Sequence, residues 1–179
     1  MNSWMANETT LKQEIENIAK QIVMAAVTAP KGRGVETLSY MILNQDDKTL
    51  LAKRMDEIAK GSQDLAFFAR DAENIRQCAT VILIGTNHTV RGINCGYCGY
   101  AMCSQKPQNQ PCVFNNIDLG IAIGSAASKA MDMRVDNRIM YSAGKAALEL
   151  PFFKEKMASI FAIPLSCSAK NIFFDRKTV

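Results

Sequence analysis

Four of the six cysteines in this 179-residue chain lie within one stretch of eighteen residues. Their spacing is C-x2-C-x4-C-x8-C, at Cys95, Cys98, Cys103 and Cys112. Two cysteines separated by two residues can converge on one metal ion or on one edge of an iron–sulfur cluster, and a third cysteine five residues later completes a compact set of thiolates. The spacing therefore predicts a metal centre.

The spacing also bears on which metal is bound. Structural zinc sites usually draw their ligands from two short pairs on separate knuckles, whereas three of these sulfurs fall within nine residues. Gly96 and Gly99 each follow a cysteine, and glycine permits the positive φ angles that let backbone N–H groups point at sulfur. We predict an iron–sulfur cluster on the cysteine-rich segment at residues 94–113. Zinc, and thiols without a metal, are the alternatives.

Composition sets the broad class of the protein. With 179 residues and 48% hydrophobic content, the chain predicts one folded domain over residues 1–179. Its longest apolar runs, Val81–Ile84 and Ile160–Ile163, fall far short of the roughly 20 residues of a membrane span. The N-terminal residues show no secretory signal, so we expect a cytoplasmic protein, where clustered cysteines are more often ligands or redox groups than disulfides.

Charge and the remaining reactive residues exclude several functions. The net charge of +4 is spread along the chain, which allows an anionic ligand but does not favour nucleic-acid binding. His88 is the only histidine, either an exposed loop residue or a ligand or proton donor beside the cluster. Without a second histidine or a phosphate-binding glycine loop, hydrolase and nucleotidase functions are disfavoured. Cys78 and Cys167 are expected to be buried, inert thiols.

Apolar periodicity predicts the helices that must position these residues. A capping box at Thr10 and Gln13 should open the first helix, which ends near Thr28. Asp46 or Asp47 should cap a second helix. Further helices are expected to open at Asp64, to span residues 116–133, and to span residues 142–150 and 152–158 with a bend at Pro151.

Three strands and one unusual helix face complete the expected elements. The strands are predicted at residues 37–43, 79–85 and 160–165, with the second in the centre of the sheet. In the helix at 116–133, Gly120, Gly124 and Ala127 form a face almost free of side chains. Such a face allows close approach either of another helix or of a flat ligand.

Two resemblances to known families follow from these motifs. The run Asn94–Cys103, followed by Asp118–Ser125, resembles the uncharacterised prokaryotic proteins that contain a ferredoxin domain. The order of elements is similar to that of the flavin-binding nitroreductases, through the alanine-rich helix ending at Ala25–Pro30 and the segment 118–144. This second resemblance implies an α+β fold with a central mixed β-sheet flanked by helices, the cysteine-rich segment being an insertion. It also implies a homodimer with FMN at its interface.

The nitroreductase resemblance implies a set of residues for FMN. The chain lacks the basic arm that precedes the first helix in that family, so cations near the loop 31–34 and in the tail are expected to hold the phosphate. Two glycines beside two cations in that loop are a recurrent arrangement for holding anions. The predicted FMN residues are Lys31, Arg33, Gly34, Ser142, Gly144 and Arg176, with Lys177 beside the last.

The sequence thus predicts an iron–sulfur electron-transfer protein or reductase, leaning toward an oxidoreductase. Electrons would pass from a [4Fe–4S] cluster to FMN and then to a small substrate, or to or from a redox partner protein. The alternative is a zinc-stabilised binding module for nucleic acid or a protein partner. No catalytic residue is predicted.

Overall fold

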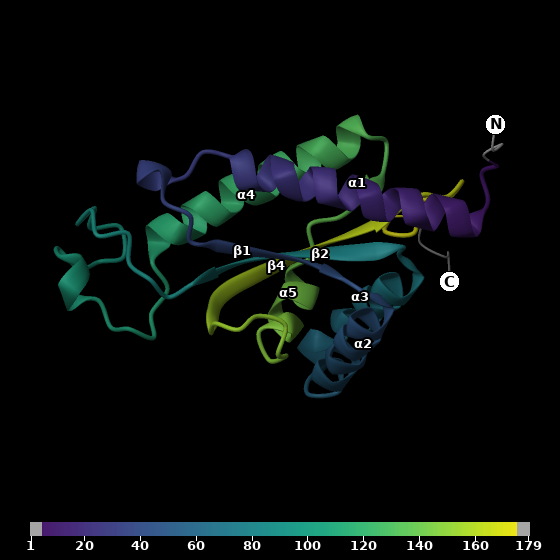
Figure 1. Ribbon diagram of the computed structural model, residues 1–179. Helices are drawn as coiled ribbons and strands as arrows, with labels where there is room; N and C mark the ends of the chain where they lie inside the picture. The colour runs from purple at the N-terminus through teal and green to yellow at the C-terminus, as the bar shows by residue number, and fades with distance from the viewer. Residues whose placement is uncertain (1–4, 175–179) are drawn as a thin grey trace.

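The computed structural model describes residues 5–174. Its helices are α1 (Glu8–Thr28), α2 (Gln45–Ala59), α3 (Phe67–Gln77), α4 (Val113–Asp132) and α5 (Tyr141–Ala147), with 3-10 turns η1 (Gly32–Gly34), η2 (Gln63–Leu65) and η3 (Cys103–Gln105). The strands are β1 (Leu38–Leu43), β2 (Thr80–Asn87), β3 (Asp136–Asn137) and β4 (Met157–Ser166). Helices α1 and α4 cover one face of the sheet, and α2, α3 and α5 cover the other (Figure 1). Among the described helices, none combines the length and the hydropathy needed to cross a membrane.

The sheet has the strand order β1-β2-β4-β3. The α+β class and the central position of β2 are confirmed, since β2 pairs with both β1 and β4. The sheet was expected to be mixed, but every pairing in residues 5–174 is antiparallel. The reason for the β1–β2 pair is that α2 and α3 form a helical hairpin between the two strands. A hairpin of two helices returns the chain to its starting end, so β2 begins beside the end of β1, where Leu43 pairs with Val81, and runs opposite to it.

Two helix starts differ from the expected ones, because asparagines rather than the predicted residues provide the caps. Asn7 caps α1: its side chain accepts from the Thr10 amide at 3.0 Å, and the Thr10 hydroxyl accepts from the Asn7 amide at 3.0 Å. Thr10 therefore lies inside the first turn. Asn44 caps α2 in the same way, accepting from the Asp47 amide at 2.9 Å. Asparagine is as good an N-cap as aspartate or serine, so the asparagine at the extended position before each helix is the cap.

The expected helix at residues 152–158 is wrong. Helix α5 ends at Ala147, turns follow, and Met157 already begins β4. Strand β4 is ten residues long and pairs with β2 from Met157 to Leu165. A strand bonded along its length to the central strand satisfies its backbone in that pairing, and this outweighs the weak local helical pattern of residues 152–158.

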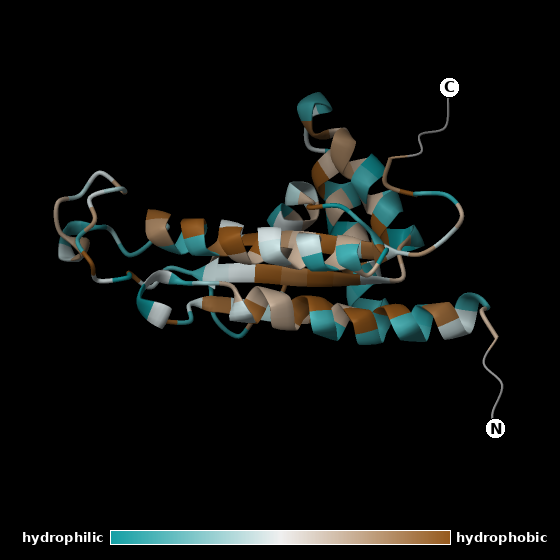
Figure 2. Ribbon diagram, turned by 90° about the horizontal axis from the view of Figure 1, so that it is seen from above, coloured by the Kyte–Doolittle hydropathy of each residue, from teal (hydrophilic) through white to brown (hydrophobic). Residues whose placement is uncertain are grey.

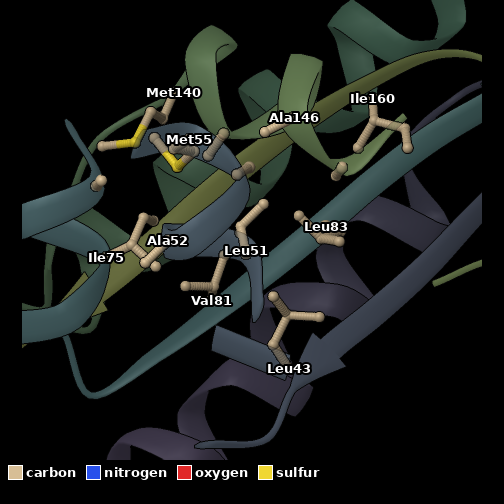
Figure 3. Close-up of a cluster of buried hydrophobic side chains, with 14 of the residues drawn as sticks. Leu43, Leu51, Ala52, Met55, Ile75, Val81, Leu83, Met140, Ala146 and Ile160 are labelled. Carbon is tan, nitrogen blue, oxygen red and sulfur yellow. The ribbon is translucent and has the colours of Figure 1, made fainter. Parts of the chain in front are cut away.

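Alternate side chains of β2 enter two apolar clusters, one on each face of the sheet. Val81 and Leu83 join the cluster with α2, α3 and α5, which Figure 3 shows in close-up. Ile82 and Ile84 join the cluster with α1 and α4. All four side chains are fully buried, and each contributes about 1.5–3 kcal/mol by leaving water. In Figure 2 the strand seen between the helices is correspondingly hydrophobic in its middle part.

Candidate functional site

The four clustered cysteines lie on one segment, residues 92–112, which we call the cysteine loop. It connects β2 to α4 and extends beyond one end of the sheet (Figure 1). Only the short turn η3 breaks its irregular course. Cys95, Cys98 and Cys103 are half-buried, whereas Cys112 is buried where α4 begins. The loop thus presents three accessible thiols and one fixed at its end.

The backbone of the cysteine loop follows the curvature predicted for it. Gly96 and Gly99 have φ angles of 72° and 88°, and a Cβ at either position would meet nothing within 4 Å. The Gly99 amide donates to the Gly96 carbonyl at 2.9 Å, which turns the chain around Cys98. The Cys103 amide donates to the Asn94 side chain at 2.8 Å, and this bond folds the third cysteine back toward the first.

The root of the loop is held by a buried ion pair between Arg91 and Asp118. Their side chains are 1% and 2% exposed. Arg91 also donates to the Val35 carbonyl at 2.6 Å and to the Thr37 hydroxyl at 3.1 Å. A buried arginine and aspartate are tolerated only when each satisfies the other, so this pair fixes the start of the loop against α4 and against the chain leading into β1.

A second contact holds the same root. The side-chain amide of Asn115, in the first turn of α4, donates to the Thr89 carbonyl. Four buried side-chain atoms in the described residues have no hydrogen-bond partner, and all four flank the loop: His88 Nδ1, Arg91 Nε, Asn115 Oδ1 and Asn116 Oδ1. Buried polar atoms are normally paired, so their gathering here indicates that this end of the molecule binds water or another polar group.

The donor chemistry of the loop fits an iron–sulfur cluster or zinc. Between residues 92 and 112 there are four cysteines and no aspartate, glutamate or histidine, so every strong ligand is a soft sulfur. Within residues 5–174, however, no three Cys, His, Asp or Glu side chains lie close enough to hold one metal ion. The assignment of Cys95, Cys98, Cys103 and Cys112 as ligands therefore stays a prediction.

Lys31, the first residue predicted to hold the FMN phosphate, contacts backbone carbonyl groups at the end of α1. Its ammonium group donates to the carbonyls of Ala26, Val27 and Ala29 at 3.0, 2.7 and 2.9 Å. The side chain is 5% exposed, and Glu36 lies 3.5 Å away. Lys31 thus caps the C-terminal end of α1, where carbonyl groups lack helical partners and a positive charge is favoured.

The rest of that loop is partly engaged. The Gly32 amide donates to both Asp118 oxygens, at 3.0 and 3.2 Å. A Cβ on Gly32 would come within 2.4 Å of the Phe114 ring. Arg33 and Gly34 are exposed, and both have positive φ angles. Of the predicted loop residues only these two are exposed, and the Gly34 amide donates to the Lys31 carbonyl at 2.9 Å.

Ser142 and Gly144 lie on the opposite face of the sheet from η1, in α5 (Figure 1). The Ser142 hydroxyl donates to buried Asp71 at 2.6 Å. A Cβ on Gly144 would lie 2.0 Å from the Ile160 carbonyl oxygen, so glycine is required for α5 to pack on β4. Arg176 and Lys177 lie outside the described residues. Of the residues predicted for FMN that the structure describes, Lys31, Arg33 and Gly34 therefore lie on one side of the sheet, and Ser142 and Gly144 lie on the other.

Sequence reasoning missed the buried ion pair of Asp118 and underestimated the burial of His88. A single acid on the buried side of an apolar helix requires a cationic partner, and this signal could have found the pair with Arg91. His88 was expected to be exposed but is half-buried. Cys167 was expected to be buried but is exposed, because it lies just past the end of β4.

Cys78 is buried, as predicted. Burial raises the pKa of its thiol to about 12, although the nearby Lys48 ammonium acts in the opposite direction. At neutral pH the thiol is therefore protonated and unreactive. Cys78 thus differs in burial from the half-buried thiols of the cysteine loop.

The comparisons with known proteins agree on a family. A family model described as an uncharacterized protein containing a ferredoxin domain matches residues 108–176. An uncharacterized protein from Archaeoglobus fulgidus is 36% identical over 184 residues, which cover 96% of this chain and 97% of that protein. The chain belongs to the family of uncharacterized ferredoxin-domain proteins. The matched segment of the family model includes Cys112, whereas the other three clustered cysteines precede it.

Solved structures identify the fold of this ferredoxin-domain protein as nitroreductase-like. A nitroreductase with bound FMN from Desulfitobacterium hafniense is 15% identical, with a TM-score of 0.60 over 94% of this chain and 82% of that one. A putative nitroreductase in complex with FMN from Desulfovibrio desulfuricans is 15% identical, with a TM-score of 0.55 over 99% and 84%. The NADPH:FMN oxidoreductase of Vibrio harveyi is 14% identical, with a TM-score of 0.54 over 87% and 60%. At these identities the likeness concerns the fold alone.

Proposed function

We propose that this protein is an iron–sulfur electron-transfer protein or reductase that holds a [4Fe–4S] cluster through Cys95, Cys98, Cys103 and Cys112. The observation that carries the proposal is the cysteine loop itself: four thiols, no competing carboxylate, and a root fixed by buried polar contacts. Membership of a ferredoxin-domain family supports a redox role. A cluster bound there would supply one-electron oxidation and reduction.

The chain's own residues would provide the rigid frame for that chemistry. Arg91 and Asp118 fix the first end of the loop, and Asn115 ties the second end to Thr89. Tyr97 stacks on Phe114 with ring centroids 6.4 Å apart and planes 5° from parallel, which holds the middle of the loop against α4. Loops that place ligands for a cluster need such fixed supports, because electron transfer is slowed by rearrangement of the ligands.

A finer part of the proposal is that FMN receives the electrons and reduces a small substrate. The nitroreductase-like fold supports it, and FMN would supply two-electron chemistry when bound. The predicted residues fit the flavin poorly, however. Lys31 caps α1, and Ser142 and Gly144 are buried on the far face of the sheet. Arg33 and Gly34 are the exposed members of the described set, so we derive no flavin step from these residues.

We also propose that two copies of the chain pair through α4. Its outer face carries Ile117 and Ile121, which are 43% and 42% exposed, and a Cβ on Gly120 or Gly124 would meet nothing within 4 Å. An apolar pocket of about 560 Å³ lies along this face, and Ile139 and Phe161 contribute to it. Most homo-oligomers pair by twofold symmetry, and a twofold pair would cover this surface in both copies.

Sedimentation tests the pairing. The wild-type chain should sediment as a dimer at micromolar concentration, whereas Ile121→Glu should sediment as a monomer because it places a charge in the apolar face. Leu50→Glu is the matched control, since Leu50 is 41% exposed on α2, on the other face of the sheet. A monomeric wild-type protein would remove this part of the proposal.

Metal analysis after anaerobic purification tests the cluster. Iron and acid-labile sulfide should be present in wild-type protein and largely absent from Cys98→Ser, because three thiolates hold a cluster poorly. Cys167→Ser is the control: it removes an exposed thiol outside the loop and should leave the iron content unchanged. Zinc at one equivalent without iron would instead support the zinc-stabilised binding module.

A further inference from the structure

A pocket of about 470 Å³ lies beside the cysteine loop, between the end of β2 and η3. Its lining comes from two segments on either side of the loop's start: His88, Thr89, Val90, Cys103, Ser104, Lys106 and Gln108. None of these residues is acidic. The pocket therefore contains a cation, an imidazole and several neutral hydrogen-bonding groups, with no negative side chain to balance the cation.

Lys106 is the residue that gives the pocket its charge. It is only 7% exposed, which is unusual for a lysine. Its ammonium group donates to the carbonyls of Pro107 and Gln110. An ammonium group has three hydrogens, and the third has no protein partner among the described residues. The two carbonyl contacts fix the direction of the group without neutralising its charge, since no acid contacts it.

His88 provides an independent indication that something polar binds in this pocket. The ring is half-buried, and its Nδ1 is fully buried without a hydrogen-bond partner. A buried ring nitrogen without a partner costs free energy that a bound polar group would recover. His88, which precedes the cysteine loop, and Lys106, within it, both line this pocket.

We propose that this pocket binds an oxyanion through Lys106 and His88, with Ser104 and Gln108 as further hydrogen-bond donors. The sign of the charge selects an anion, and the donors match oxygen acceptors. The oxyanion is either a free small ion or the terminal phosphate of a cofactor such as FMN. Lys31, which was predicted to hold that phosphate, instead contacts the carbonyl groups at the end of α1. The binding site itself needs no cluster. Its role in delivering an anionic substrate or cofactor beside Cys103 rests on the proposed function.

The first experiment uses inorganic phosphate as the probe and the single histidine as the reporter. The Cε1–H proton of His88 gives a unique NMR signal in the intact, anaerobically purified protein, because the chain has no other histidine. Phosphate should shift this signal saturably at constant pH and ionic strength. In Lys106→Gln the apparent dissociation constant should rise at least about tenfold, because a charge-assisted hydrogen bond is lost.

A second variant protects the test from a folding failure. Gln108 is exposed, so Gln108→Glu should leave the fold intact while placing an anion in the pocket, and phosphate affinity should fall about tenfold. The matched control is Gln63→Glu on η2, an exposed residue that makes the same change of charge away from the pocket. Equal phosphate affinity in wild-type, Gln108→Glu and Gln63→Glu proteins, or no saturable shift in any of them, would overturn the proposal.

Flavins distinguish the two sources of the oxyanion. FMN and riboflavin differ only by the phosphate, and quenching of their fluorescence measures binding. Tighter binding of FMN than riboflavin, lost in Gln108→Glu, supports the cofactor phosphate. Phosphate binding without this preference supports a free oxyanion. Iron measured in the same samples separates the oxyanion site from the proposed iron–sulfur function. If protein purified without iron still binds phosphate, the oxyanion site is retained and the proposed function fails.

Discussion

Two loops at the same end of the sheet, residues 31–34 and the cysteine loop, look equally suited to bind a ligand by composition. Each contains at least one glycine at positive φ and a lysine. In the first loop the Lys31 ammonium contacts three carbonyls, and the Gly32 amide contacts Asp118. In the second, three thiols are accessible and Lys106 keeps one hydrogen without a partner.

The difference shows that residue type alone does not identify a binding loop. What distinguishes the two is whether the polar groups are already satisfied by the protein. A cation that completes the end of a helix is structural, whereas a cation or thiol held in place without a full set of partners is available to a ligand. The first prediction concerns Asp118, the residue that supports both loops.

Asp118→Ala should have the largest effect. It leaves Arg91 buried without its counter-charge and removes the acceptor for the Gly32 amide. Breaking one side of a buried ion pair typically costs about 3–5 kcal/mol, and we expect the free energy of unfolding in urea to fall by that amount. Asp132→Ala, at the exposed end of the same helix, should change it by less than about 0.5 kcal/mol. Equal stabilities for the two variants would mean that the pair does not anchor the loops.

Gly144→Ala should have the next largest effect. The added methyl group would meet the Ile160 backbone at 2.0 Å, so α5 or β4 must shift. Overpacking of this kind costs about 1–3 kcal/mol. Lys145→Ala, at an exposed position of the same helix, should change the temperature of thermal unfolding little. A stable Gly144→Ala protein would mean that this glycine is not required by packing.

Lys31→Gln should lower stability without changing cofactor content. The variant loses the charge that contacts the α1 carbonyls, and we expect a loss of about 1–2 kcal/mol in unfolding free energy. Iron content and phosphate affinity should match those of the wild-type protein. Arg33→Gln, in the same loop but exposed, should leave stability unchanged. A marked loss of phosphate or FMN binding in Lys31→Gln would restore Lys31 as a ligand-binding residue.

Much of the fold could be predicted from the sequence because its signals are local. Apolar periodicity up to Thr28 placed the end of α1, and the continuous apolar run Val81–Ile84 placed the central strand. The direction of β2 could not be predicted in this way. It depends on how α2 and α3 pack together, which is a contact between distant residues. The extent of β4 was missed for the same reason, since its pairing with β2 overrides the local pattern.

The candidate site could be predicted where the spacing of residues determines the chemistry. It could not be predicted where the outcome depends on whether a polar group already has hydrogen-bond partners in the fold. The cysteine spacing identified the loop directly. The charge of Lys31 was visible in the sequence. Its side chain contacts the α1 carbonyls only because the chain turns at Pro30 and directs the side chain back toward the helix end. Lys106 gave no signal in the sequence, because its burial arises from the fold of the loop around it.

The smallest predicted effect separates Cys78 from the loop thiols through pH. The pKa of this thiol is raised from 9.0 to about 12 by burial, so the unfolded chain loses the proton at lower pH than the folded one. Its contribution to stability is therefore complete below pH 9 and is lost as pH rises toward about 12.

By pH 10 that loss should reach about 1 kcal/mol. Lys48, whose pKa is lowered by burial, has the opposite slope, but it is present in every protein compared. Urea unfolding of wild-type and Cys78→Ala proteins at pH 8 and pH 10 isolates the thiol: the variant should lose less stability between the two values. Cys167→Ala, which removes an exposed thiol, should behave as wild type. The same alkaline loss in Cys78→Ala would show that burial does not raise the pKa of Cys78, and this ground for calling Cys78 inert would no longer hold.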